Sequence, residues 1–118
     1  MLRTGLPSGT MDVLILKALS LKHLHGYGVL LWISKALGVT VRQGSVYPAL
    51  SRLENLDLIL SELGKSESGR QVKYYRLTRA GRRALKYQTA IWEECAAAMA
   101  LALAAAPTTR TDLEGVDS

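Results

Sequence analysis

Apolar residues recur at intervals of three and four along three stretches in the first half of the chain. This period predicts a first helix over residues 11–21, a second from Gly26 to Leu37, and a third that begins at Ser45. Gly38 suits the left-handed residue that ends many helices. The Ser45 hydroxyl can cap the third helix, and Pro48 then falls in the first turn, where its missing N–H removes no helical bond.

The segments around these helices are predicted from local chemistry. Thr10 carries a hydroxyl that can cap the first helix. Residues 21–25 are expected to form a connector, and residues 39–43 a loop that holds one extended pairing segment. Residues 1–9 contain two glycines and a proline and are expected to be a flexible lead-in.

The predicted third helix has two different faces. Its inward stripe is apolar and consists of Ala49, Leu50, Leu53 and Leu56. Its outward face is slim, polar and carries one cation, and it consists of Tyr47, Ser51, Arg52 and Asn55. A helix with such a face fits the major groove of duplex DNA, which is about 12 Å wide.

From residue 58 the pattern changes to a period of two. Residues 59–63 and 71–77 are predicted strands, and residues 64–69 form a turn-rich loop between them. Thr78 is expected to cap a long final helix that Pro107 ends, and residues 107–118 to be a disordered tail.

Three helices, a hairpin and a further helix, in this order, predict a mainly α fold with a small β-hairpin wing. This is the winged helix-turn-helix arrangement. We expect residues 10–77 to form the DNA-binding domain and residues 78–106 a C-terminal helix that joins two copies.

Composition is consistent with one small domain. The chain has 118 residues, 48% of them apolar, and a mean hydropathy of +0.10. No run reaches the roughly 18 apolar residues of a membrane span, and nothing resembles a signal peptide. The single cysteine, Cys95, fits a reducing compartment, so we expect a cytoplasmic protein without a membrane partner.

The charge is concentrated in one third of the chain. The net charge is +5, and residues 65–86 hold eight cations against the single acid Glu67. A solvated surface normally mixes both signs, so this concentration points to a polyanionic partner. On the hairpin the cations are expected to lie over phosphates or in the minor groove.

Several strings resemble those of the PadR family of bacterial transcriptional regulators. They are Asp12-Val13-Leu14-Ile15-Leu16, Leu24-His25-Gly26-Tyr27-Gly28, Gly44-Ser45-Val46-Tyr47-Pro48-Ala49-Leu50 with Arg52-Leu53-Glu54, and Lys73-Tyr74-Tyr75-Arg76-Leu77-Thr78 with Gly81. The resemblance covers about residues 10–86 and is to short-tailed members with one C-terminal helix. It implies a homodimeric regulator of double-stranded DNA, usually a repressor.

The resemblance and the pattern together single out eight residues at the DNA. Those on or beside the third helix are Ser45, Tyr47, Pro48, Ser51 and Arg52, and those on the hairpin are Lys65, Arg70 and Lys73. A winged helix used only for protein–protein contacts is the alternative, against which the basic hairpin argues.

The final helix carries two apolar stripes. One stripe is enough to pack the helix on its own domain, so the second predicts another packing partner. The expected dimer contacts are Leu85, Ile91, Trp92, Cys95, Met99 and Leu103. The alternative is a helix buried in its own domain. Trp32 and Trp92 could line a pocket for a planar aromatic effector, or serve as ordinary packing anchors.

No constellation in the sequence predicts catalysis, a cofactor or a metal. His23 and His25 have no carboxylate or thiolate at ligand spacing, so a role beside a helix end is the better interpretation. Glu93 and Glu94 diverge by about 100° on a helix and cannot act together on one substrate. Cys95 lies among alanines, as a small packing residue does.

Overall fold

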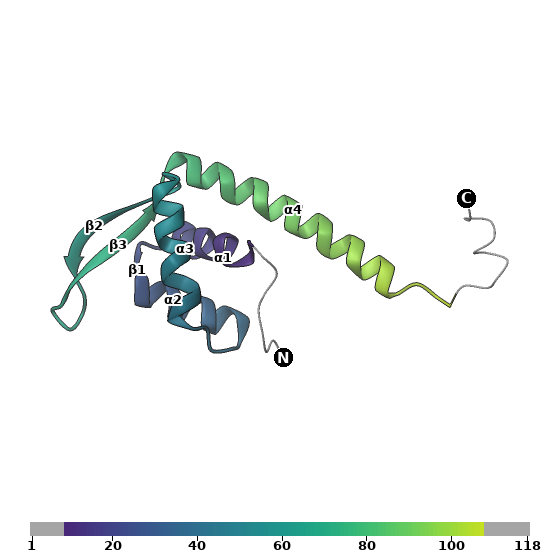
Figure 1. Cartoon of the computed structure of the whole chain (residues 1–118), viewed down its shortest axis with the longest axis horizontal. Helices are drawn as coiled ribbons and strands as arrows, with labels where there is room; N and C mark the ends of the chain where they lie inside the picture. The colour runs from purple at the N-terminus through teal and green to yellow at the C-terminus, as the bar shows by residue number, and fades with distance from the viewer. Residues whose placement is uncertain (1–8, 108–118) are drawn as a thin grey trace.

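The structure, a computed structural model, describes residues 9–107 and consists of four helices and three strands (Figure 1). The helices are α1 (Thr10–Leu21), α2 (Gly26–Leu37), α3 (Gln43–Asn55) and α4 (Arg79–Leu103), and the strands are β1 (Leu24–His25), β2 (Ile59–Lys65) and β3 (Gln71–Leu77). The expected mainly α fold with a hairpin is confirmed. The predicted lead-in and tail lie, apart from residues 9 and 107, outside the described residues.

Helices α1, α2 and α3 pack around one core, which the base of the hairpin closes. The largest fully buried side chains come from all of these elements and are Ile15, Leu16, Leu19, Val29, Ile33, Val46, Leu50, Leu53 and Ile59. The inward stripe predicted for α3 is right except at Leu56, which is 60% exposed. Leu56 follows the last helical residue, so the helical period no longer applies to it. Val46, which the predicted stripe did not include, is buried near the start of the helix.

Two predicted caps are wrong. Helix α1 begins at Thr10 itself, after Gly9 in the left-handed conformation, and no side chain caps it. Helix α3 begins two residues before Ser45, and its cap residue is Arg42, again without a side-chain bond. Pro48 is therefore the sixth helical residue, in the second turn, where it cannot donate to the carbonyl of Gly44.

The third strand is not where the pattern placed it. Strand β1, in the predicted connector, pairs antiparallel with β3 through Leu24–Tyr75 and His25–Tyr74, so the sheet order is β1-β3-β2. The loop of residues 38–42 holds no strand, and the N–H of Val41 donates instead to the Ser34 hydroxyl at 3.0 Å. Strand β2 extends to Lys65 because it pairs with β3 along its whole length.

Helix α4 is fastened at its start and then leaves the domain (Figure 1). As predicted, the Thr78 hydroxyl caps it by accepting from the N–H of Gly81 at 2.9 Å, and it also donates to the carbonyl of Asp57. A Cβ at Gly81 would overlap the carbonyl oxygen of Leu58, so only glycine permits this docking. No helix within residues 9–107 is long and apolar enough to cross a membrane.

Candidate nucleic-acid interface

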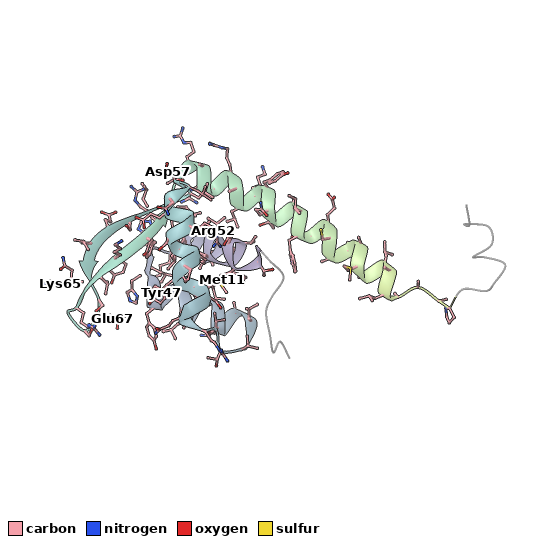
Figure 2. The ribbon with its side chains drawn as sticks, viewed as in Figure 1. Met11, Tyr47, Arg52, Asp57, Lys65 and Glu67 are labelled. Carbon is pink, nitrogen blue, oxygen red and sulfur yellow. The ribbon has the colours of Figure 1, made fainter. Side chains whose placement is uncertain are left out.

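The exposed face of α3 carries the residues predicted for base contact. Ser45, Tyr47, Pro48, Ser51 and Arg52 are all exposed, as the polar side of the helical pattern requires. The opposite side of α3 is held by Val46 and Leu50 in the core. Figure 2 shows Tyr47 and Arg52 along α3. The helix therefore presents a polar face while its other side is fixed in the core.

Tyr47 joins α3 to the start of α2. Its ring lies against Gly26, and a Cβ on that glycine would come within 2.5 Å of Cε1. Tyr47 also lies near Tyr75 on β3, whose pKa is raised above its usual 10 by burial, then by the Glu54 carboxylate and by Tyr47. The ring thus contacts α2 and lies near the hairpin, while 40% of the residue stays exposed.

Arg52 is not a free cation. Its guanidinium donates to the carboxylate of Asp12 on α1, while 53% of the Arg52 side chain remains exposed. The ion pair crosses from α3 to α1 and orients the Arg52 head group. An exposed pair of this kind contributes only about 0–1 kcal/mol to stability, so its main effect is on orientation.

The hairpin is stiffened by local bonds. The turn closes with the N–H of Gly69 on the carbonyl of Ser66 at 2.9 Å, and Gly69 has a φ of 85°, which favours glycine. The Tyr74 hydroxyl donates to the carbonyl of Lys65 at 2.9 Å, and its ring covers Gly64. The predicted cations Lys65, Arg70 and Lys73 all lie exposed on this hairpin.

The hairpin, β1 and the starts of α2 and α3 enclose an open groove of about 1060 Å³, which we call the wing groove. Tyr47, Arg70 and Lys73 line it together, whereas Lys65 and Arg52 do not. Its wall also holds residues that the sequence interpretation did not assign to the interface, namely Lys22, Tyr27, Leu31 and Gln43. The groove therefore combines cations, polar groups and exposed rings from four elements.

His25 builds the corner of this groove. Its Nδ1 accepts the N–H of Gly28 at 3.0 Å and caps α2, and its ring packs at 5.4 Å against Tyr74. This agrees with a role beside a helix end. Within residues 9–107 no group of three or more His, Cys, Asp or Glu side chains could hold a metal ion.

Comparison with known proteins decides the family. Residues 15–87, more than half of the chain, match the model of the transcriptional regulator PadR-like family. The chain belongs to the PadR-like family of transcriptional regulators. Its winged helix is thus a DNA-binding one, and the resemblance seen in the sequence is confirmed.

Solved structures support the same assignment. A PadR-like transcriptional regulator from Bacillus cereus is 28% identical, with a TM-score of 0.74, covering 83% of this chain and 95% of that one. A PadR family regulator from Clostridium difficile is 30% identical, with a TM-score of 0.70, covering 80% and 99%. An uncharacterised protein of Lysinibacillus sphaericus is 28% identical over 96 residues, 80% of this chain and 88% of that protein.

In this PadR-like regulator, α4 leaves an apolar face uncovered. Among the predicted dimer contacts, Trp92 is 49%, Met99 57% and Leu103 78% exposed, and Ile91 and Cys95 are exposed as well. Leu85 differs, because it packs partly buried against the core of its own domain. The same helical side is thus covered at its start and open further along.

The two tryptophans of this regulator do not share a site in the single chain. Trp32 packs partly buried against the core from α2, and Trp92 lies on the open part of α4. Neither lines the wing groove. A planar aromatic effector between them stays a prediction, and it needs a second copy of the chain to bring the rings together.

Residues of the wing groove missed from the sequence carried only weak signals. Lys22 lies in the predicted connector, and Tyr27 lies within the Leu24–Gly28 string at the start of the second helix. Neither position carried a signal for DNA contact. Gln43 was placed in a loop because the start of α3 was predicted too late. Their contribution depends on β1 pairing with β3, which brings residues 22–28 beside the hairpin.

Proposed function

We propose that this PadR-like regulator binds a specific site in double-stranded DNA as a homodimer and represses transcription there. The observation that carries the proposal is the wing groove, which Tyr47 from α3 lines together with Arg70 and Lys73 from the hairpin. Base edges would contact the exposed face of α3, and phosphates would contact the hairpin cations. Repression follows if the bound protein covers a promoter.

The homodimer is proposed from the open apolar face of α4. Trp92, Met99 and Leu103 would each expose large apolar surface to water in a single chain. Pairing two such faces buries them and holds two copies of α3 at a separation of about one helical turn of DNA, or a multiple. The protein would act in the cytoplasm, where bacterial DNA lies.

The experiment is a binding titration with two duplexes. One duplex comes from the region upstream of the protein's own gene, because repressors often bind there, and the other has random sequence. We expect tighter binding to the upstream duplex and a steep loss of affinity for both with salt. Transcription in vitro from the bound promoter should fall as protein is added.

Three results would contradict the proposal or part of it. Equal affinity for both duplexes at every salt concentration would show that binding is not specific for the upstream sequence. Failure to bind either duplex at low salt would favour the alternative, a winged helix that contacts only proteins. A stable complex with one protein chain per DNA site would contradict the proposed homodimer.

A further inference from the structure

A second basic surface lies on α4, away from the wing groove. It consists of Arg79, Arg82, Arg83 and Lys86, all of them exposed. The residues between them are buried or partly buried, so every exposed side chain from residue 79 to 86 is a cation. Neither of the two ion pairs found within residues 9–107 involves any of the four.

This arrangement works against the stability of the helix. The four cations stand at spacings of three and four, so each has like-charged neighbours on the helix surface. They also occupy the first two turns of α4, where the macrodipole favours anions, and the first turn has no acidic residue. A polyanion bound to this surface would offset both unfavourable terms.

The position of the surface matches a DNA backbone. Helix α4 starts beside the turn after α3, where Asp57 lies (Figure 2). The Thr78 hydroxyl donates to the carbonyl of Asp57, and Gly81 packs on Leu58. The 13 residues of α3 span about 20 Å, whereas the major groove is about 12 Å wide. An α3 that crosses the groove with Tyr47 inside it would therefore bring its C-terminal end beside a bordering phosphate strand.

We propose that Arg79, Arg82, Arg83 and Lys86 bind the phosphate backbone that borders the major groove at the C-terminal end of α3. The inference rests on the proposed DNA-binding function. A protein partner fits less well, because protein interfaces centre on apolar and aromatic side chains, and residues 79–86 expose none. Phosphate contacts are independent of sequence, so any duplex can serve as the probe.

The test compares paired substitutions of equal charge change. Two variants remove neighbouring cations of this surface, Arg79→Gln with Arg83→Gln, and Arg82→Gln with Lys86→Gln. The matched control, Lys17→Gln with Lys35→Gln, removes two exposed cations from α1 and α2. Affinity for a random-sequence duplex is measured against salt, and thermal unfolding is followed by circular dichroism.

We expect at least one of the two double variants of this surface to bind the random-sequence duplex about tenfold or more weakly than the control variant. Its slope of log K against log salt should fall by about one to two units, one for each lost phosphate contact. The same double variant should unfold at the wild-type temperature or higher, since the loss of two cations relieves the repulsion between them and their neighbours. A solvated basic surface would raise thermal stability without this change in slope.

Wild-type affinity and slope in both surface pairs would overturn the inference. If Arg70→Ala with Lys73→Ala weakens binding in the same assay, the proposed function stands although this surface is not used. If the wild-type protein binds no duplex at low salt, the proposed function itself fails. The two failures are therefore distinguishable.

Discussion

The ring of Tyr47 on α3 lies directly over Gly26, the first residue of α2, leaving no room for a Cβ between them. Gly26 has an ordinary helical backbone, so the glycine is needed for the close approach and not for a positive φ. This contact holds the start of α2 close to α3. It also places Tyr47 at the edge of the wing groove.

Adding a methyl group at Gly26 should displace the Tyr47 ring. We expect Gly26→Ala to lower the free energy of unfolding by about 1–3 kcal/mol through overpacking, and to weaken binding to a specific DNA site. Denaturant unfolding and DNA titration measure the two effects. In the double variant with Tyr47→Ala the penalty should shrink, because the clash is gone.

Gly44→Ala is the control for this change. Gly44 also lies in the first turn of a helix, and a Cβ there would meet nothing within 4 Å. It should keep or raise stability, since alanine is the better helix former by about 1 kcal/mol. Equal stability of the Gly26 and Gly44 variants would mean that the ring moves aside freely.

Arg52 should contribute to DNA specificity more than to stability. Arg52→Ala is expected to cost less than about 1 kcal/mol of folding free energy, because its ion pair with Asp12 is exposed. The ratio of specific to random DNA affinity should fall by the 1–3 kcal/mol of a base contact. Asp12→Asn breaks the ion pair but keeps the cation, so it should retain most of that ratio. A specificity ratio unchanged by Arg52→Ala would show that Arg52 makes no base contact that contributes to specificity.

The hairpin cations should act without regard to sequence. We expect Arg70→Ala with Lys73→Ala to weaken specific and random DNA about equally, because both side chains would contact phosphates. The slope of log K against log salt should flatten by about one unit for each contact. The measurement is a titration of both duplexes over a range of salt. Random-duplex binding that stays intact at low salt would contradict this assignment.

A charge on the open face of α4 should separate the two copies. Met99 is 57% exposed in the single chain, so Met99→Lys should leave the monomer folded but place an unpaired charge in the proposed contact. Sedimentation of the Met99→Lys variant should show monomers, and its affinity for the specific DNA site should drop. Ala97→Lys, on the opposite side of the helix, is the control and should remain dimeric. A tight dimer of Met99→Lys would place the interface elsewhere.

Tyr75 should make stability depend on alkaline pH. Its pKa is raised by burial first, and then by the Glu54 carboxylate and Tyr47. The stabilisation is complete below the unfolded pKa of about 10 and is lost as pH rises through the higher folded pKa. From about pH 9 upward, wild type should therefore lose more unfolding free energy than Tyr75→Phe does. Tyr27→Phe, at a 52% exposed position, should follow wild type; parallel curves for all three proteins would contradict the prediction.

Local chemistry in the sequence was enough to predict most of the elements. The three-and-four spacing of Ile15, Ala18 and Leu19 specified α1, the change to a period of two specified β2 and β3, and Thr78 and Gly38 marked helix ends. Each of these signals involves residues only a few positions apart. The helical hydrogen bonds form within one element, and those of the hairpin join β2 to β3, the next strand along the chain. Local sequence is therefore enough to determine both.

The tertiary structure decided what depends on residues far apart in the chain. Strand β1 exists only because Leu24 meets Tyr75, and α3 begins at Gln43 without the capping side chain that local rules require at Ser45. The wing groove, the pairing of Arg52 with Asp12 and the burial of Leu85 arise in the same way. The exposed polar face of α3 was therefore determined by sequence, whereas its partners were determined by packing, because burial and pairing energies belong to contacts between elements and not to either element alone.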